Sequence, residues 1–127
     1  MSDLTIHTSG PMFDGQAKRA AHDFSRKASE KIADEGAEMV RDQLHEVIRH
    51  PTGYYESHIQ VRVHSELDRV ITDGGIVYGP WLEGTSERNN TTRFKGYKTF
   101  RLIKQELESK AGDIAERILP LYKSRME

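Results

Sequence analysis

Acidic and basic side chains that could hydrolyse a bond gather around the only tryptophan of the chain. The acids are Asp73, Glu83 and Glu87, and the basic residues beside them include Arg93 and Lys95. Carboxylates near a lysine can serve metal-dependent cleavage of a phosphodiester bond. Their spacing matches no nuclease signature, so we interpret these residues as a turn and as surface charge. The sequence therefore predicts no enzymatic activity and no cofactor.

The histidines do not have the spacing of a metal site. His45 and His50 are five residues apart in an expected helix, which places them on different faces. His58 and His64 share a face of an expected strand, but they stand about 20 Å apart along it. The chain has no cysteine, which excludes disulfides, thiolate metal ligands and a cysteine nucleophile. We therefore expect surface histidines and no bound metal.

A second possible chemistry is the binding of nucleic acid by residues 88–104. In the stretch RFKGYKTFR, cations alternate with aromatic residues, as in proteins that hold phosphates and stack single-stranded bases. Alternatively Phe94, Tyr97 and Phe100, spaced by three, pack the segment against the body of the protein. Residues 84–104 contain six basic residues and one acidic residue, whereas the whole chain has 19 and 20. The protein therefore carries a basic segment on an acidic body.

The stretch YGPWLEGT, residues 78–85, has the character of a protein–protein contact. It is short, aromatic and rich in glycine, and tryptophan and tyrosine are enriched where proteins meet. Trp81 could also be a core residue at the end of a strand. We expect Glu83 to pair with an arginine across a subunit boundary. The expected interface residues are Tyr78, Trp81, Leu82, Glu83, Arg88, Arg93, Phe94 and Tyr97.

Helical spacing dominates both ends of the chain. From Gly15 to Arg49, apolar residues recur at steps of three and four, which predicts one long helix. Gly36 lies inside it and could mark a bend or a break. A second helix is expected from about Thr99, a possible cap, to Arg125. Residues 1–14 have no sustained periodicity and contain Gly10 and Pro11, and we expect a flexible or partner-ordered arm there.

Between the helices, the pattern predicts a small antiparallel meander. Tyr54–His64 alternates as a strand with one exposed face, and Leu67–Thr72 and Ile76–Tyr78 follow as further strands. A tight hairpin turn is expected at Asp73-Gly74-Gly75. Such a sheet needs a cover on its apolar face, and we expect the C-terminal helix to provide it. The predicted fold is α+β, with an irregular loop before the last helix and a single domain over residues 15–127.

Composition narrows the remaining classes of function. A length of 127 residues suits one domain, and 35% hydrophobic against 31% charged residues indicates a thin core. Some apolar surface would then be buried only in an assembly. A net charge of −1 creates no global field that attracts nucleic acid or membranes. Because no apolar run approaches a membrane span and the N-terminus does not resemble a signal peptide, we expect a cytoplasmic protein.

The order of these features resembles the tail-completion or head–tail joining proteins of long-tailed bacteriophages. In that family a long helix leads to a P-x-TG-like turn, a strand and a Y-x-x-x-(V/L)-E-x-GT element. A variable loop and an F…(P/T)F approach to the C-terminal helix follow. The resemblance covers about residues 15–125. The matching parts of this chain are His50–Gly53, Tyr54–His64, Tyr78–Thr85 and Arg93–Phe100.

The resemblance implies a structural virion protein of the phage neck or tail, in a ring around the DNA channel that is expected to be a hexamer. It would assemble in the host cytoplasm, and its partners would be head–tail connector and tail tube or terminator proteins. DNA would pass without specific binding, because an acidic body repels phosphate, and no membrane is involved. Departures at Pro51 and at Gly79-Pro80-Trp81 leave tail-completion, terminator and stopper proteins open. The alternative is a nucleic-acid-binding accessory protein that uses residues 88–104.

Overall fold

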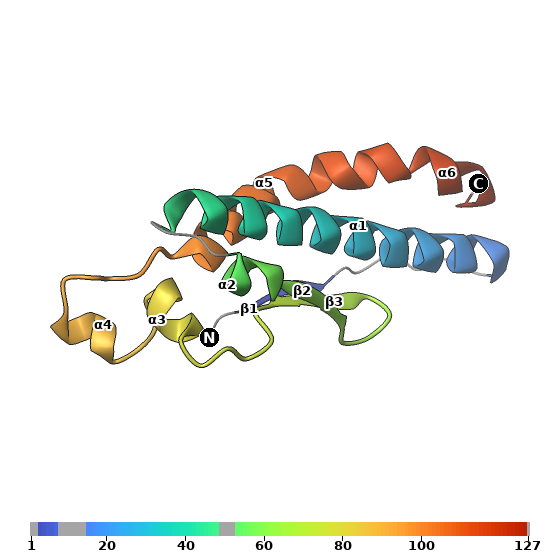
Figure 1. Cartoon of the computed structure of the whole chain (residues 1–127). Coiled ribbons are helices and arrows are strands. Elements are labelled where there is room, and N and C mark those ends of the chain that lie inside the picture. The colour runs from blue at the N-terminus through green and yellow to red at the C-terminus, as the bar shows by residue number, and fades with distance from the viewer. Residues whose placement is uncertain (1–2, 8–14, 49–52, 127) are drawn as a thin grey trace.

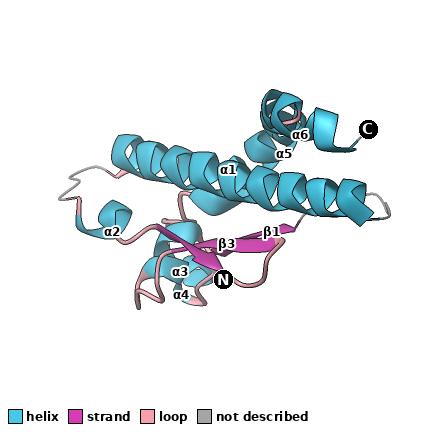
Figure 2. Cartoon of the chain, turned by 90° about the vertical axis from the view of Figure 1, so that its right-hand side faces the viewer, coloured by secondary structure: helices cyan, strands magenta, loops and turns pink. Residues whose placement is uncertain are grey.

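The computed structural model describes residues 3–7, 15–48 and 53–126. Its long first helix lies between a small sheet on one side and the C-terminal helices on the other (Figures 1 and 2). The predicted α+β class is confirmed. The elements are β1 (Asp3–His7), α1 (Gly15–Val47), α2 (Tyr54–Ser57), β2 (Gln60–Val63), β3 (Asp68–Thr72), α3 (Gly79–Glu83), α4 (Arg88–Thr91), α5 (Thr99–Ile118) and α6 (Pro120–Met126).

Helix α1 supplies most of the packing surface of the protein. Its buried positions are largely alanines, which let neighbouring elements approach closely but bury little area each. The helix continues through Gly36, so the expected bend or break is wrong. A Cβ at Gly36 would lie 2.7 Å from the Ile71 side chain and 2.8 Å from that of Leu107. The glycine therefore makes room where β3 and α5 meet α1.

The sheet has the strand order β1-β3-β2, and both pairings are antiparallel. Leu4 of β1 and Val61 of β2 both lie opposite Ile71 of the central strand. Leu4, Ile6 and Ile71 belong to the hydrophobic core that α1 covers. Alternate residues therefore point to the helices, as the period of a strand requires.

Two parts of the predicted meander are wrong. Tyr54–Ser57 forms the short helix α2, so only Gln60–Val63 of the first predicted strand pairs in the sheet. The predicted strand at residues 76–78 is not a strand, and the chain there turns into α3. The third strand is β1 instead, which corrects the prediction of a flexible arm for residues 3–7. Leu4 and Ile6 do alternate with polar residues, but this alternation covers a single five-residue stretch. The rest of that arm lies outside the described residues.

The turn after β3 has the backbone conformation expected of its glycines but not the expected hairpin. Gly74 and Gly75 both have positive φ angles, of 74° and 82°. Asp73 is buried, where its carboxylate accepts hydrogen bonds from the Tyr55 hydroxyl at 2.8 Å and from the Gly75 amide at 2.9 Å. These two bonds direct the chain away from the sheet and towards α3.

The C-terminal helices pack mainly on α1, and their main contact with the sheet is between α5 and β1. The predicted packing of the C-terminal helix on the sheet is present where α5 meets β1, but α1 provides the larger part of the cover. The rings of Phe24 and Tyr122 lie 6.2 Å apart, edge to face. Arg125 forms an ion pair with Asp23 at 3.1 Å. These contacts align α6 with the first half of α1.

Candidate functional site

Seven of the eight expected interface residues, all but Tyr78, lie in residues 79–98, which we call the loop module. The sequence predicted an irregular loop here, but the module contains α3 and α4. Pro80 stands in the first turn of α3, where its missing amide hydrogen costs nothing, and Gly84 ends the helix with a φ of 99°. The module lies at one end of the molecule, near the end of α1 (Figure 1).

Three aromatic rings form the centre of the loop module. The ring centroids of Trp81 and Phe94 are 5.0 Å apart, and those of Phe94 and Tyr97 are also 5.0 Å apart. The guanidinium of Arg88 lies over the Trp81 ring at 5.1 Å, a favourable cation–π distance. All three aromatic side chains are half-buried. Phe100, which the three-residue spacing grouped with them, lies instead in the main core.

A buried asparagine holds the module together. The Asn89 side chain is 2% exposed, and its amide donates hydrogen bonds to the carbonyl oxygens of Trp81 at 3.1 Å and Phe94 at 3.2 Å. Its own oxygen accepts a bond from the Ser86 amide at 3.0 Å. The sequence analysis missed this residue. Asparagine is typical of turns, but only the fold distinguishes Asn89 from the exposed Asn90 beside it.

The two ends of the module cross at a pair of glycines. A Cβ on Gly84 would overlap the carbonyl oxygen of Lys95, and a Cβ on Gly96 would overlap the backbone of Gly84. Next to this crossing, the Tyr97 amide donates a hydrogen bond to the Leu82 carbonyl at 2.7 Å. The module is therefore a closed unit with a defined shape.

Glu83 joins the loop module to α5. Its side chain is 7% exposed, and its two oxygens accept hydrogen bonds from the backbone amides of Phe100 at 2.8 Å and Arg101 at 3.2 Å. It thus caps the N-terminus of α5, a role that we expected of Thr99. Burial raises the pKa of the Glu83 carboxyl above its usual range, although both amide bonds oppose that shift.

The expectation that Glu83 pairs with an arginine of another subunit is therefore wrong. Leu82 also faces inward, where it packs against the core. Tyr78 remains 43% exposed, with its ring 5.7 Å from that of Tyr55, and Val77 before it is 95% exposed. Of the expected interface residues, the fold brings together Arg88 and the three module aromatics, while Arg93 is exposed.

The cations of the basic segment all lie at the surface. Within the described ranges, none of them forms an ion pair with an acidic side chain. Lys95 alone uses its amine within the module, donating to the Asn89 carbonyl at 2.8 Å. The six exposed residues are Arg88, Arg93, Lys95, Lys98, Arg101 and Lys104.

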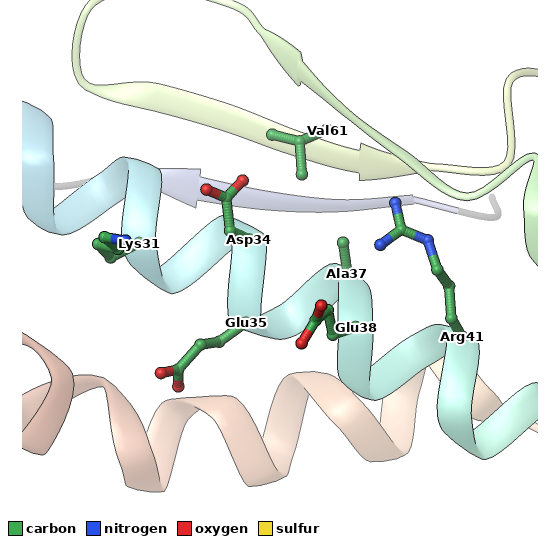
Figure 3. A pocket seen from close by; sticks show the side chains of 7 residues that line it. All are labelled: Lys31, Asp34, Glu35, Ala37, Glu38, Arg41 and Val61. Carbon is green, nitrogen blue, oxygen red and sulfur yellow. The ribbon is translucent and has the colours of Figure 1, made fainter.

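A second surface feature is a hollow of about 400 Å³ between α1 and β2 (Figure 3). Sequence analysis did not identify it, because it joins positions on a helix to a strand that follows much later. In Figure 3, the side chains of Asp34 and Arg41 both extend from α1 towards the sheet, with Ala37 between them. The hollow is lined by Lys31, Asp34, Glu35, Ala37, Glu38, Arg41 and Val61.

Comparison with known proteins gives no match: no family model, no curated protein and no solved structure is significantly similar to the chain. In the part of the chain that the structure describes, no three histidine or acidic side chains come together as a metal site. Among the same residues, no helix is long and apolar enough to cross a membrane.

Proposed function

We propose that the chain is a non-enzymatic structural subunit that assembles with copies of itself, as a ring in the neck or tail of a long-tailed bacteriophage. The observation that carries the proposal is the loop module, a closed surface unit with half-buried aromatic residues and exposed cations. Its residues coincide with the stretches that resemble the phage family. Clusters of tryptophan, tyrosine and arginine are the usual centres of protein–protein contacts.

The acids nearest the module are poorly placed for catalysis. Glu83 accepts hydrogen bonds from the first turn of α5, and Asp73 accepts them from Tyr55 and from the turn after β3. Both carboxylates are buried and engaged, so neither is available as a general base or a metal ligand. Their positions favour a structural role over hydrolysis.

The second candidate is a nucleic-acid-binding accessory protein, favoured by the unpaired cations of residues 88–104. The module aromatics support it less well. Phe94 packs between Trp81 and Tyr97, and Arg88 already covers the Trp81 ring, so a base would have to displace this arginine to stack. Self-assembly needs no such rearrangement.

Mass and shape in solution test the proposal. We expect rings by light scattering and negative-stain microscopy, at a range of concentrations and at low and high salt. Trp81→Ala should weaken assembly, whereas Leu121→Ala, at an exposed apolar residue of α6, should not. A protein that remains monomeric under all conditions would argue against the proposal.

A titration with single-stranded DNA then tests the alternative. Binding through phosphates should weaken by roughly 0.9 log units per log unit of salt for each phosphate neutralised. Tight binding with that dependence, together with an absence of rings, would favour the accessory protein.

A further inference from the structure

The second half of α1 carries a row of exposed acidic side chains. Asp34, Glu38 and Asp42 are exposed and follow one another at four-residue intervals, so they lie about 6 Å apart along one face. We call these three residues the acidic stripe. In the described part of the chain none of them forms an ion pair, whereas the neighbouring Glu35 pairs with Arg117 at 3.2 Å.

The acidic stripe is unfavourable in the isolated chain for two reasons. Like charges four residues apart on a helix repel one another. The C-terminal end of a helix also carries a partial negative charge, so Asp42 and Glu46 stand where cations are preferred. Lys31 and Arg41 line the same hollow, but in the described part of the chain neither forms an ion pair with the stripe, and the Arg41 guanidinium donates a hydrogen bond to the Ile59 carbonyl at 2.8 Å. A partner that brought cations would relieve this repulsion.

The stripe borders the hollow between α1 and β2, where Asp34 and Glu38 form part of the lining (Figure 3). Strand β2 is at the edge of the sheet, so the hollow opens where no further strand of the described residues pairs. Val61 lines it, and Val63 on the same strand is 69% exposed. The surface thus offers carboxylates, an apolar floor and space for long side chains.

The loop module has the complementary properties. Its cations Arg93 and Lys98 are exposed and have no acidic partner in the described ranges, and its aromatic centre is half-buried. We propose that the loop module of one copy docks on the acidic stripe and the adjoining hollow of a second copy. This inference rests on the proposed function, since it names the two faces through which the copies meet.

The contact joins two different faces, so it is head-to-tail. A contact of this kind closes into a ring if the rotation between neighbours allows it, and otherwise continues as a filament. Each copy would use its module on one side and its stripe on the other. The opposite charges of the module and the stripe would then neutralise one another in the assembly.

Two basic surfaces of a second copy could meet the acidic stripe: the loop module and the first half of α1. The charge distribution favours the loop module. The first half of α1 is also basic, but part of the charge at its end of the molecule is already paired internally. Lys27 contacts Glu30 at 3.3 Å, and Arg125 of the adjoining α6 contacts Asp23. His22 lies 2.7 Å from Glu66. The module cations have no such acidic partners.

Two neutralised variants test the contact. The stripe variant combines Asp34→Asn, Glu38→Gln and Asp42→Asn, and the module variant combines Arg93→Gln and Lys98→Gln. Each should assemble about tenfold more weakly than the unchanged protein, as expected for the loss of two or three surface ion pairs. A control that replaces Glu108, Asp113 and Glu116 on α5 by their amides removes the same charge and should assemble normally.

Mixing the two variants provides the decisive measurement. The stripe variant keeps its module and the module variant keeps its stripe, so a mixture should form heterodimers with one copy of each. Larger assemblies should stay rare at concentrations between the dissociation constants of the intact and the weakened contact, because each heterodimer has only one intact contact. Native mass spectrometry distinguishes these species, and thermal unfolding by circular dichroism verifies that both variants are folded.

Three outcomes would overturn the inference, and they bear differently on the proposed function. If both variants form rings as readily as the unchanged protein, the contact is wrong but the ring subunit stands. If the unchanged protein never assembles, both proposals fail. If the module variant assembles normally but loses binding to single-stranded DNA, the partner of the module is nucleic acid.

Discussion

Glu83 connects the loop module to α5, and its replacement tests how that connection is made. Glu83→Ala removes both acceptors of the first turn of α5 and leaves the Phe100 amide without a partner inside the protein. Loss of a helix cap costs about 0.5–2 kcal/mol, and a buried unpaired amide costs about 1–3 kcal/mol. These two effects overlap, so we expect a loss of about 2 kcal/mol in the free energy of unfolding.

Glu83→Gln should cost less, about 0.5–1 kcal/mol, because one oxygen remains as an acceptor and no charge has to be buried. Urea unfolding at pH 7 measures both values. Circular dichroism follows the helices, while fluorescence of Trp81, the only tryptophan, follows the module. We expect the fluorescence transition of Glu83→Ala to move to lower urea than its circular dichroism transition. Equal stability of Glu83→Ala and the unchanged protein would refute the capping role.

The pH dependence of the same variants gives an independent test. Burial raises the folded pKa of Glu83 above 4.5, its value without the fold. The folded state therefore binds more protons in the window between 4.5 and the folded pKa, and the stability contributed by this group falls as pH rises through that window. On lowering the pH from 7, the unchanged protein should gain stability relative to Glu83→Gln. A relative loss would mean that the amide bonds outweigh burial.

Three further substitutions test the packing of the module and of α1. Asn89→Ala removes three hydrogen bonds inside the module, and we expect a loss of about 2 kcal/mol in urea unfolding followed by Trp81 fluorescence. Gly96→Ala would overlap the backbone of Gly84 at a φ of 93°, so the Trp81 emission should shift to longer wavelength while helix content by circular dichroism is retained. Gly36→Ala should lower stability by about 1 kcal/mol in thermal unfolding, because overpacking costs about 1–3 kcal/mol and only part is offset by better helix propensity. A stabilised Gly36→Ala variant would show that Ile71 and Leu107 move aside at little cost.

The sequence determined the elements whose signal is local. The two long helices follow from apolar residues at steps of three and four, which is a property of each segment alone. Strand β3 and the positive φ angles of Gly74 and Gly75 were predicted for similar reasons. In the candidate site, the same reasoning selected Trp81 and Phe94, whose rings do lie together.

Only the tertiary structure decided which of these parts meet. Strand β1 forms by pairing with β3, where Leu4 lies opposite Ile71. These residues are far apart in the chain, and the pattern of a five-residue segment does not reveal its partner. Glu83 reads as a surface charge in sequence, yet it is buried because the first turn of α5 presents two free amides to it. Periodicity records the face that a segment buries, whereas its partner depends on the path of the whole chain. For that reason the sequence indicated the residues of the loop module, whereas the fold determined that Glu83 joins the module to α5. The fold also determined that the acidic stripe on α1 forms no ion pair within the described residues.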